Sequence, residues 1–435
     1  MSNSKRNRTS TATTRRSASA DRLSDVPEYV LHRILSFMPT FDAIRMSLVS
    51  KRFRNIWFHI PVLDFPQSRT KHIDFVGFVK NCFSRRIQVS PHDDLNNLEK
   101  FMLHIDYELF DYPNTIDYWL RYVLQMGVKE LDLSIKPSNN LYSAPYYCVP
   151  ESLLNNSTAT SLTMLKLNNV GLRTSVHTSL PSLTSLSLTD VHLEEEEEEY
   201  ESGILLQNLI SGCPNIECLY WGRRIKRRIN FLKDPISYID LTVCRALKIL
   251  SLYCSKLADK WLEDIVFGLP LLERLALDDC YGFKKLTIRS QSLKSFYFFC
   301  DRYSDIEVTL FTPNLVYFSY KGDGGSVFLM TSPNLLGEAV VKLVATDEHR
   351  IWYLDLLLLL SNLNCFNTMK LYLPSEKALL FPKYMRKMCH STLPDLKHLK
   401  VKIHDDFNRH RELMKALLRL APCLQTLEIK RQSYL

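Results

Sequence analysis

The chain has 435 residues, of which 46% are hydrophobic, and its formal net charge is +8 at pH 7. This is enough apolar material for a large core, so the composition excludes a disordered protein and predicts two or three domains or one extended repeat array. Five of the positive charges lie in residues 1–20, which contain no acid, so the rest of the chain carries only +3. Because positive and negative charges nearly balance in residues 21–435, the composition argues against a general nucleic-acid-binding protein, which gathers basic charge on one face.

Residues 1–20 are rich in Ser, Thr and Arg, and after Met1 they contain no apolar residue larger than Ala. They have nothing to bury, so we expect a disordered basic tail that is dispensable for folding. Two other interpretations stay open, a weak nuclear signal and an organelle transit peptide, because both are basic and poor in acids.

Three short helices are predicted over residues 21–58. Pro27 falls in the first turn of the first helix, where its missing N–H costs nothing, and Pro39 ends that helix. Thr40 and Ser50 can cap the two helices that follow. The first helix carries an apolar stripe at helical spacing, formed by Val30, Leu31, Ile34 and Leu35. A domain this small seldom buries enough apolar surface to be stable alone, so we expect part of the stripe to meet a neighbour.

The segment LSDVPEYVLHRILSFMPTFDAIRMSLVSKRFRNIW, residues 23–57, resembles the F-box, the module that docks on a Skp adaptor and through it on a cullin ubiquitin ligase. Without the resemblance, the same pattern also fits a small helical cap on the next domain. Phe53 departs from the family, because plant members often have Trp at this position. The resemblance implies adaptor contacts from Leu23, Pro27, Val30, Leu31, Ile34, Leu35, Phe37, Val49, Ser50, Phe53 and Trp57.

From residue 128 onward the template LxxLxL returns eleven times. The copies are VKELDL (128–133), LTMLKL (162–167), LTSLSL (183–188), IECLYW (216–221), LKILSL (247–252), LERLAL (272–277), LKSFYF (293–298), LVYFSY (315–320), FNTMKL (366–371), LKHLKV (396–401) and LQTLEI (424–429). Their spacing is irregular, roughly 20 to 34 residues with some long insertions, and brackets the period of leucine-rich repeats. The last three residues of each copy alternate as in a short strand with one buried face. Stacked copies pair into a parallel sheet and bury that face. We expect such a solenoid over 59–390, with VLDF at 62–65 as a candidate first strand.

The last stretch, 391–435, resembles the FBD region that closes many plant F-box proteins. Its sequence predicts two strands, STLPDLKHLKVKI and CLQTLEI, around one helix, RHRELMKALLRLAP. The whole chain therefore resembles a plant F-box/leucine-rich-repeat protein of the FBD-containing type. The fold class that follows is α/β: a three-helix F-box, a solenoid of parallel strands with helical or irregular returns, and an FBD-like C-terminal cap.

In each repeat strand, the residues between and just after the two final apolar positions point away from the core, toward the concave face. Most of these residues are small or polar, but Tyr253, Tyr297 and Phe299 place three aromatic side chains close together. Buried aromatic anchors often contribute about 2 kcal/mol or more each to an interface. We predict this cluster as a substrate contact; the alternative is that an inserted loop covers it.

Two charge runs interrupt the repeats, six glutamates at 194–199 and GRRIKRRINFLK at 222–233. Like-charged runs usually lie in solvated loops, and we expect both to be surface insertions. The alternative for the basic run is a docking patch for a phosphorylated or acidic substrate segment, because arginine binds phosphate oxygens in bidentate fashion. A phosphate-bearing small ligand is a further variant, by analogy with hormone-sensing F-box relatives. The residues of the patch would be Arg223, Arg224, Arg227 and Arg228.

The sequence contains no pattern that requires a cofactor or a metal. It has no GxGxxG or Walker-type loop, no HExxH and no CxxC pair among its eleven cysteines. An odd number of cysteines cannot all pair within one chain, so we expect reduced thiols and a cytoplasmic or nuclear location. The apolar segment 351–363 is too short to span a bilayer and is interrupted by Asp355, so we expect a buried element and no membrane partner.

We therefore predict a non-catalytic substrate receptor. Its partners would be a Skp adaptor, through it a cullin ligase, and an unidentified protein substrate, with no direct nucleic-acid contact. Two alternatives stay open. One is a leucine-rich-repeat interaction adaptor whose diverged F-box assembles no ligase, and the other is an enzyme with a nucleophilic Cys–His pair, since such pairs assemble in space rather than in sequence.

Overall fold

The computed structural model of the chain describes residues 26–48, 53, 56–66, 74–89, 98–107, 113–137, 146–154, 159–172, 178–193, 199–223, 235–300, 306–323, 326–331, 337–344, 353–385, 392–404 and 410–431. Several sequence predictions lie outside these residues: the basic tail 1–20, most of the acidic run, and the individual residues Leu23, Val49, Ser50, Arg224, Arg227 and Arg228. The predicted third helix is described only at Phe53 and from Ile56 onward.

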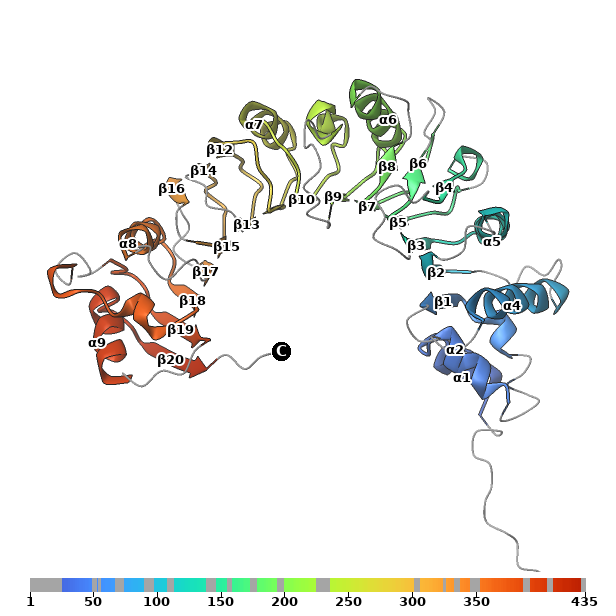
Figure 1. Ribbon diagram of the computed structural model, residues 1–435, viewed down its shortest axis with the longest axis horizontal. Helices are drawn as coiled ribbons and strands as arrows, with labels where there is room; N and C mark the ends of the chain where they lie inside the picture. Colours follow the sequence, from blue (N-terminus) through green and yellow to red (C-terminus); the bar gives the residue numbers. More distant parts are fainter. Residues whose placement is uncertain are drawn as a thin grey trace, which may run out of the picture.

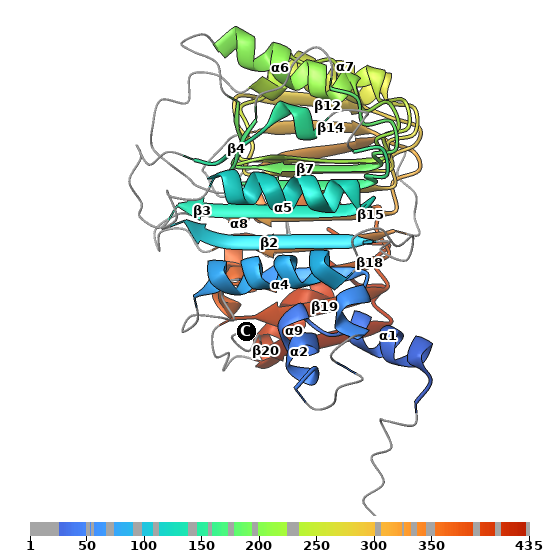
Figure 2. The same cartoon turned by 90° about the vertical axis from the view of Figure 1, so that its right-hand side faces the viewer.

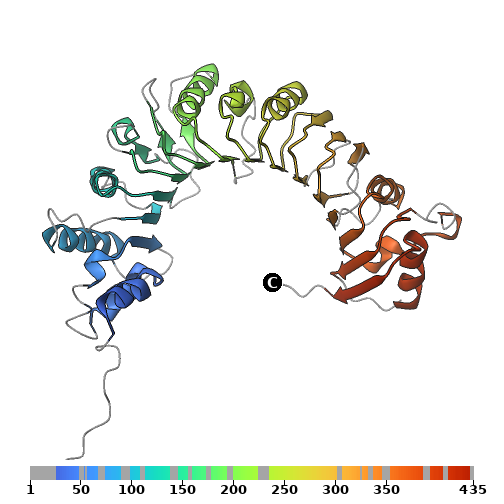
Figure 3. The ribbon, with the colours of Figure 1, turned by 180° about the vertical axis from the view of Figure 1, so that it is seen from behind.

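The described strands form an open arc whose concave side is one long parallel sheet (Figure 1). Fourteen described strands pair in this sheet in the order in which they occur along the chain. They are β1 (Val62–Pro66), β2 (Lys100–Tyr107), β3 (Glu130–Pro137), β5 (Met164–Asn168), β7 (Ser185–Thr189), β9 (Cys218–Gly222), β10 (Ile249–Tyr253), β11 (Arg274–Asp278), β13 (Ser295–Phe299), β15 (Tyr317–Gly322), β17 (Glu338–Leu343), β18 (Thr368–Leu373), β19 (His398–Ile403) and β20 (Thr426–Arg431). The two ends of the arc do not meet, as the view from behind also shows (Figure 3).

Helices and two short sheets cover the convex side (Figure 2). The helices of the solenoid are α4 (Phe75–Val89), α5 (Pro113–Gln125), α6 (Glu199–Ser211), α7 (Asp259–Gly268), α8 (Tyr353–Asn362) and α9 (His410–Leu420). The short sheets are β4 (Cys148–Val149), β6 (Gly171–Leu172) and β8 (His192–Leu193), and β12 (Lys285–Arg289), β14 (Glu307–Phe311) and β16 (Val327–Thr331). Helix α8 lies within segment 351–363 and buries Leu356, Leu357, Leu359 and Leu360, so the prediction of a buried element is confirmed for one face of this helix.

The prediction of repeated strands is confirmed, because all eleven LxxLxL copies supply strands of the long sheet. The candidate strand at 62–65 is β1. Strands β2 and β17 were not predicted. In β17 Ala339 takes the place of a leucine, so this strand does not display the template. Around β2, Leu98, Phe101 and Leu103 have the same spacing as the copy LKSFYF, so this strand was missed although it fits the template.

The core lies between the long sheet and the convex elements. The second and fourth residues of each strand point into it, for example Leu250 and Leu252 of β10, and both are fully buried. Because the strands pair in register, these residues stack on their counterparts in neighbouring strands, as Leu250 does on Leu275. Each repeat therefore covers the apolar face of the next, which is why a single repeat would not be stable alone.

Several turns after the strands require a left-handed backbone. Asn169, Asp190, Cys254 and Asp279 have φ values of 54°, 50°, 47° and 53°. Asn and Asp tolerate this conformation better than most residues. Each of the four donates its backbone N–H to the neighbouring strand, at 2.7 to 3.1 Å, so the turn continues the hydrogen-bond ladder beyond the strand end.

Candidate functional site: two interaction surfaces

The first candidate surface lies on the N-terminal helices α1 (Glu28–Ser36) and α2 (Thr40–Met46). Each begins directly after a proline, Pro27 or Pro39, whose fixed φ suits the entry to a helix. Their inner faces close a small cluster of buried side chains, formed by Leu31, Leu35, Ala43, Phe53, Ile56 and Ile60.

This cluster corrects part of the predicted adaptor surface. Leu31 and Leu35 have no exposed area, and Phe53 and Trp57 are only 2% exposed. They hold the chain's own core together, so a partner cannot contact them unless the helices separate. The three helices bury more of their apolar stripe among themselves than their size suggested.

The outer faces of the same helices keep large apolar side chains in solvent. Exposure is 43% for Ile34, 74% for Phe37, 75% for Tyr29 and 82% for Leu48. We call these four residues the helical patch. Ile34 and Phe37 were predicted as contacts; Tyr29 and Leu48 were missed, because helical spacing alone does not show which residues two helices leave uncovered. Of the other predicted contacts, Pro27 is exposed and Val30 is half-buried.

The N-terminal helices are fixed to the first strand of the solenoid. Trp57 and Phe58 belong to the main core rather than to the small cluster. The rings of Phe41, in α2, and Phe78, in α4, meet edge to face with centroids 5.4 Å apart. The buried guanidinium of Arg86 donates from Nη2 to the carbonyl of Ile60 at 3.1 Å. The helical patch is thus held at a defined position relative to the arc.

The second candidate surface is the concave face of the long sheet. The first, third and fifth residues of each strand point to this face, and the register aligns them in three rows across all fourteen described strands. Tyr297 lies in the third row, and Tyr253 and Phe299 lie in the fifth. None of the three belongs to the core, so the predicted orientation of these rings is confirmed. Their role as a substrate contact stays a prediction.

Further aromatic rings extend this cluster. Tyr317 packs on Tyr297 with ring centroids 5.1 Å apart, and the Arg274 guanidinium lies 5.7 Å from the Tyr297 ring. Tyr220 occupies the third row beside Ser251, on the strand before Tyr253. Burial raises the pKa of both Tyr220 and Tyr317, so these hydroxyls stay neutral and can donate hydrogen bonds. Neither tyrosine was predicted, because contact between strands does not follow from one repeat's sequence.

Near its N-terminal end the concave face carries a closed polar network. Asp132 accepts hydrogen bonds from His104 Nε2 at 3.0 Å and from Lys166 Nζ at 2.9 Å. Burial disfavours the Asp132 carboxylate, but these two donors outweigh it and hold the pKa of Asp132 below its usual value. Next to this network Asn168 donates to Ser134 at 3.1 Å. These groups satisfy one another and leave little capacity for a ligand.

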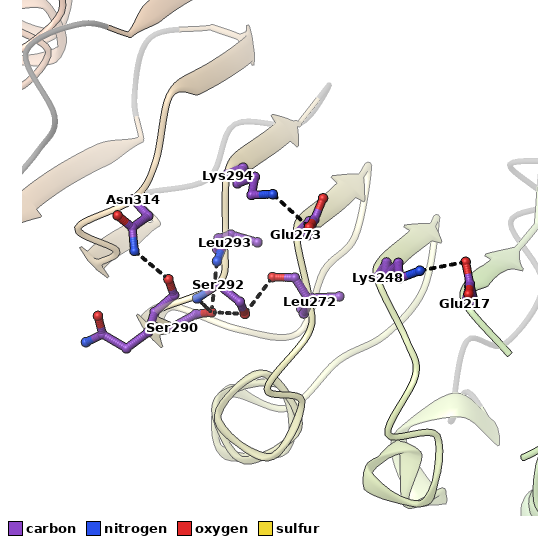
Figure 4. A network of polar contacts seen from close by, with 10 residues as sticks. Glu217, Lys248, Leu272, Glu273, Ser290, Ser292, Leu293, Lys294 and Asn314 are labelled. Atoms are coloured by element: carbon purple, nitrogen blue, oxygen red, sulfur yellow. Dashed lines mark hydrogen bonds and ion pairs between the residues drawn. The ribbon is translucent and has the colours of Figure 1, made fainter. Parts of the chain in front are cut away.

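A shallow depression of about 360 Å³ lies at the rim where strands β10 to β15 begin. Its polar groups are used by the chain itself (Figure 4): Lys294 pairs with Glu273 at 2.7 Å, and Ser292 Oγ donates to the Leu272 carbonyl at 2.9 Å. Further along the same rim Lys248 pairs with Glu217 at 2.9 Å. The depression is therefore part of the packing between repeats.

Two family models match the chain. The model of the F-box domain matches residues 23–63, and the model named At1g61320/AtMIF1, LRR domain, matches residues 95–237. The chain therefore contains an F-box followed by a leucine-rich-repeat region.

The relatives of the chain include several proteins from Arabidopsis thaliana. The F-box/FBD/LRR-repeat protein At2g26030 is 28% identical over 53% of this chain and 46% of its own length. The F-box/FBD/LRR-repeat protein At4g26340 is 30% identical over 50% of this chain and 47% of its own length. The F-box/FBD/LRR-repeat protein At5g22700 is 26% identical over 76% of this chain and 60% of its own length. The chain thus spans about half the length of the first two relatives. Neither family model reaches residues 391–435, so their FBD-like character stays a prediction.

Among solved structures, the leucine-rich repeat-containing protein LegL7 from Legionella pneumophila resembles the chain with a TM-score of 0.31 and 15% identity. The match covers 75% of this chain and 91% of LegL7. We draw no functional argument from it.

Burial changes the chemistry of several cysteines in the described part of the chain. Burial raises the pKa of Cys82 and Cys213 to about 12 and that of Cys244 and Cys365 to about 11, so these thiols are poor nucleophiles. No group of three or more metal-binding side chains occurs among the described residues, and no described helix is long and apolar enough to cross a membrane.

Proposed function

We propose that this protein is the substrate-recognition subunit of a Skp–cullin–F-box ubiquitin ligase. The F-box docks on the Skp adaptor, and the concave face of the solenoid holds the protein to be ubiquitinated. Other subunits perform the transfer, so this chain contributes by bringing the substrate close, which raises its effective concentration at the transfer site.

The observation that carries the proposal is the rigid link between two separate interaction surfaces. The helical patch is exposed, and the three aromatic side chains lie on the concave face outside the core, half-buried or exposed. The helices that bear the patch pack against the solenoid through Trp57, Phe58 and Arg86. A receptor needs such a link, because the substrate must be held at a fixed position relative to the transferring subunits.

We place the proposed complex in the cytoplasm, the nucleus or both. All the described cysteines are free, as is usual in a reducing compartment.

The test is capture of the Skp adaptor and cullin by the purified chain, compared with the variant Ile34→Asp. We expect the variant to lose the adaptor, because a charge in an apolar interface stays unpaired. Leu358→Asp is the matched control: Leu358 is 47% exposed on α8, far along the chain from the helical patch, and this variant should keep the adaptor.

Two results would contradict the proposal. If the Ile34→Asp variant folds and still captures adaptor and cullin as the wild type does, the helical patch is not the docking surface. A wild-type chain that captures other proteins but no adaptor would favour the alternative of an interaction protein outside any ligase.

A further inference from the structure

The fifth row of the concave face becomes a row of lysines at its C-terminal end. After Phe299 of β13, the row continues through the strands β15, β17, β18, β19 and β20 with Lys321, Lys342, Tyr372, Lys402 and Lys430. It contains no acidic residue over these strands. We call these four lysines, with Phe299 and Tyr372, the lysine row.

The register places like charges directly opposite one another. Lys321 is paired with Lys342, and Lys402 is paired with Lys430. In the third row beside them Lys370 is paired with Lys400. Like charges directly opposite on neighbouring strands destabilise a sheet, so this arrangement costs folding free energy.

Elsewhere in the described sheet, cross-strand charges are complementary. On the concave face Lys100 pairs with Glu130 at 3.1 Å and Lys166 with Asp132 at 2.9 Å. At the rim, Lys294 with Glu273 and Lys248 with Glu217 follow the same pattern (Figure 4). The lysine row breaks a rule that the rest of the sheet obeys, and such local violations are typical of functional sites.

Among the described residues, two glutamates pair with lysines of this region. Glu338 pairs with Lys370 at 2.5 Å, and Glu428 pairs with both Lys400 and Lys430. Lys342 and Lys402 have no ion-pair partner among the described residues, and Lys342 is exposed. Two lysines lie against the rings of the row: Lys321 Nζ is 3.6 Å from the Phe299 centroid, and Lys402 Nζ is 5.3 Å from that of Tyr372.

We propose that the lysine row binds an extended acidic segment of a protein, rich in Asp, Glu or phosphoserine. The proposal rests on the proposed role as a substrate receptor and names the class of substrate. Neighbouring strands are about 4.8 Å apart, so the row from β15 to β20 spans roughly 19 Å, the length of about six extended residues. Alternate anionic side chains of such a segment can reach successive lysines, while Phe299 and Tyr372 offer apolar surface to the residues between them.

The same charges argue against a nucleic acid. Asp278 precedes Phe299 in the fifth row, and Asp132 lies further along the concave face, so a polyanion longer than the lysine row meets carboxylates. A short acidic peptide fits within the basic stretch.

The experiment measures binding of a fluorescent 12-residue peptide of alternating Asp and Ser to the full chain. A peptide with phosphoserine and Gly in place of Asp and Ser distinguishes the two sources of negative charge, and a peptide with Asn in place of Asp is the neutral control. We expect both acidic peptides to bind and their affinity to fall as salt shortens the screening length from about 10 Å toward 3 Å. Lys342→Glu/Lys402→Glu should weaken binding about tenfold or more.

Lys80→Glu/Lys260→Glu is the matched control, because it makes the same change in net charge at two exposed lysines of the convex helices α4 and α7. Its affinity should stay within about twofold of the wild type. Folding is not at risk in the test variant, since the change at position 342 places a carboxylate opposite Lys321 and relieves a repulsion.

Three results would overturn the proposal: no binding of either acidic peptide by the wild type, equal losses in the two double variants, or tighter binding of single-stranded RNA than of the peptides. Adaptor capture by Lys342→Glu/Lys402→Glu is measured in parallel and should equal that of the wild type. If the wild type captures no adaptor but binds the acidic peptides as predicted, the receptor role is wrong and the lysine row remains an acidic-peptide site.

Discussion

The hydroxyl of Thr40 accepts a hydrogen bond of 2.6 Å from the backbone N–H of Asp64. Thr40 begins helix α2, and Asp64 is the middle residue of β1, the edge strand of the long sheet. Edge strands present unpaired backbone groups that invite association with other chains. Here a helix of the F-box covers that edge and satisfies one of these groups, so the F-box also caps the solenoid.

Replacing Thr40 by Val should remove this hydrogen bond and leave the Asp64 N–H unsatisfied in a partly buried place. We expect a loss of about 1 to 2 kcal/mol in the free energy of unfolding. Thr40→Ser keeps the hydroxyl and is the control. Denaturant unfolding measures both, and equal stability of the two variants would show that the bond contributes nothing.

Arg86 is fully buried beneath the F-box, and its Nε and Nη1 atoms have no hydrogen-bond partner among the described residues. Burial lowers the pKa of this guanidinium, opposed by the neighbouring Tyr122 hydroxyl, so its charge is destabilising where it lies. Arg86→Met, similar in length and uncharged, should therefore keep or raise the stability. Arg86→Ala leaves a cavity and should cost about 3 kcal/mol. Thermal unfolding of both variants separates the effect of the charge from that of the packing. A larger loss of stability in Arg86→Met than in Arg86→Ala would show that the buried charge is not destabilising.

Asp132 should make the stability depend on pH. Its pKa is lowered in the folded state, so its contribution is complete above the ordinary Asp value of about 3.9 and is lost as the pH falls through the folded-state pKa. Asp132→Asn should be less stable than the wild type at pH 7, and the difference should shrink below about pH 4. Thermal unfolding of both proteins over this range gives the result; a difference that does not change with pH would mean that the ion network is not its source.

The aromatic cluster gives a separate prediction about the substrate. Replacing Tyr253, Tyr297 and Phe299 together by Ala should leave adaptor capture intact and abolish recovery of substrates by proximity labelling under proteasome inhibition. All three side chains lie on the concave face outside the core, so the change should cost little stability. Ser185, Ser187 and Thr189 of β7 lie on the same face, and their replacement by Ala is the control. Unchanged recovery of every partner by the aromatic variant would exclude the cluster as the contact.

The sequence by itself determined the repeated strands of the solenoid. In each LxxLxL copy the alternation of apolar and polar residues has the period of a strand, and the eleven copies supplied eleven of the fourteen described strands. It also predicted which face of each strand is concave, because that depends only on the same alternation. Strand β17 escaped the template because Ala339 fills a core position that the tertiary structure, and not the residue type, defines. Strand β2 fits the template with Phe101 in place of a leucine and was missed.

Only the tertiary structure decided which residues share a surface. In the F-box, helical spacing placed Leu31, Ile34 and Leu35 on one stripe, but the packing of α1 against α2 buries two of them and exposes the third. On the concave face, Lys321, Lys402 and Lys430 each follow a predicted repeat strand. Lys342 belongs to β17, which the template missed, so the sequence did not show the four lysines as one row. They become neighbours because parallel strands pair in register, and this pairing depends on how the whole array closes over its core.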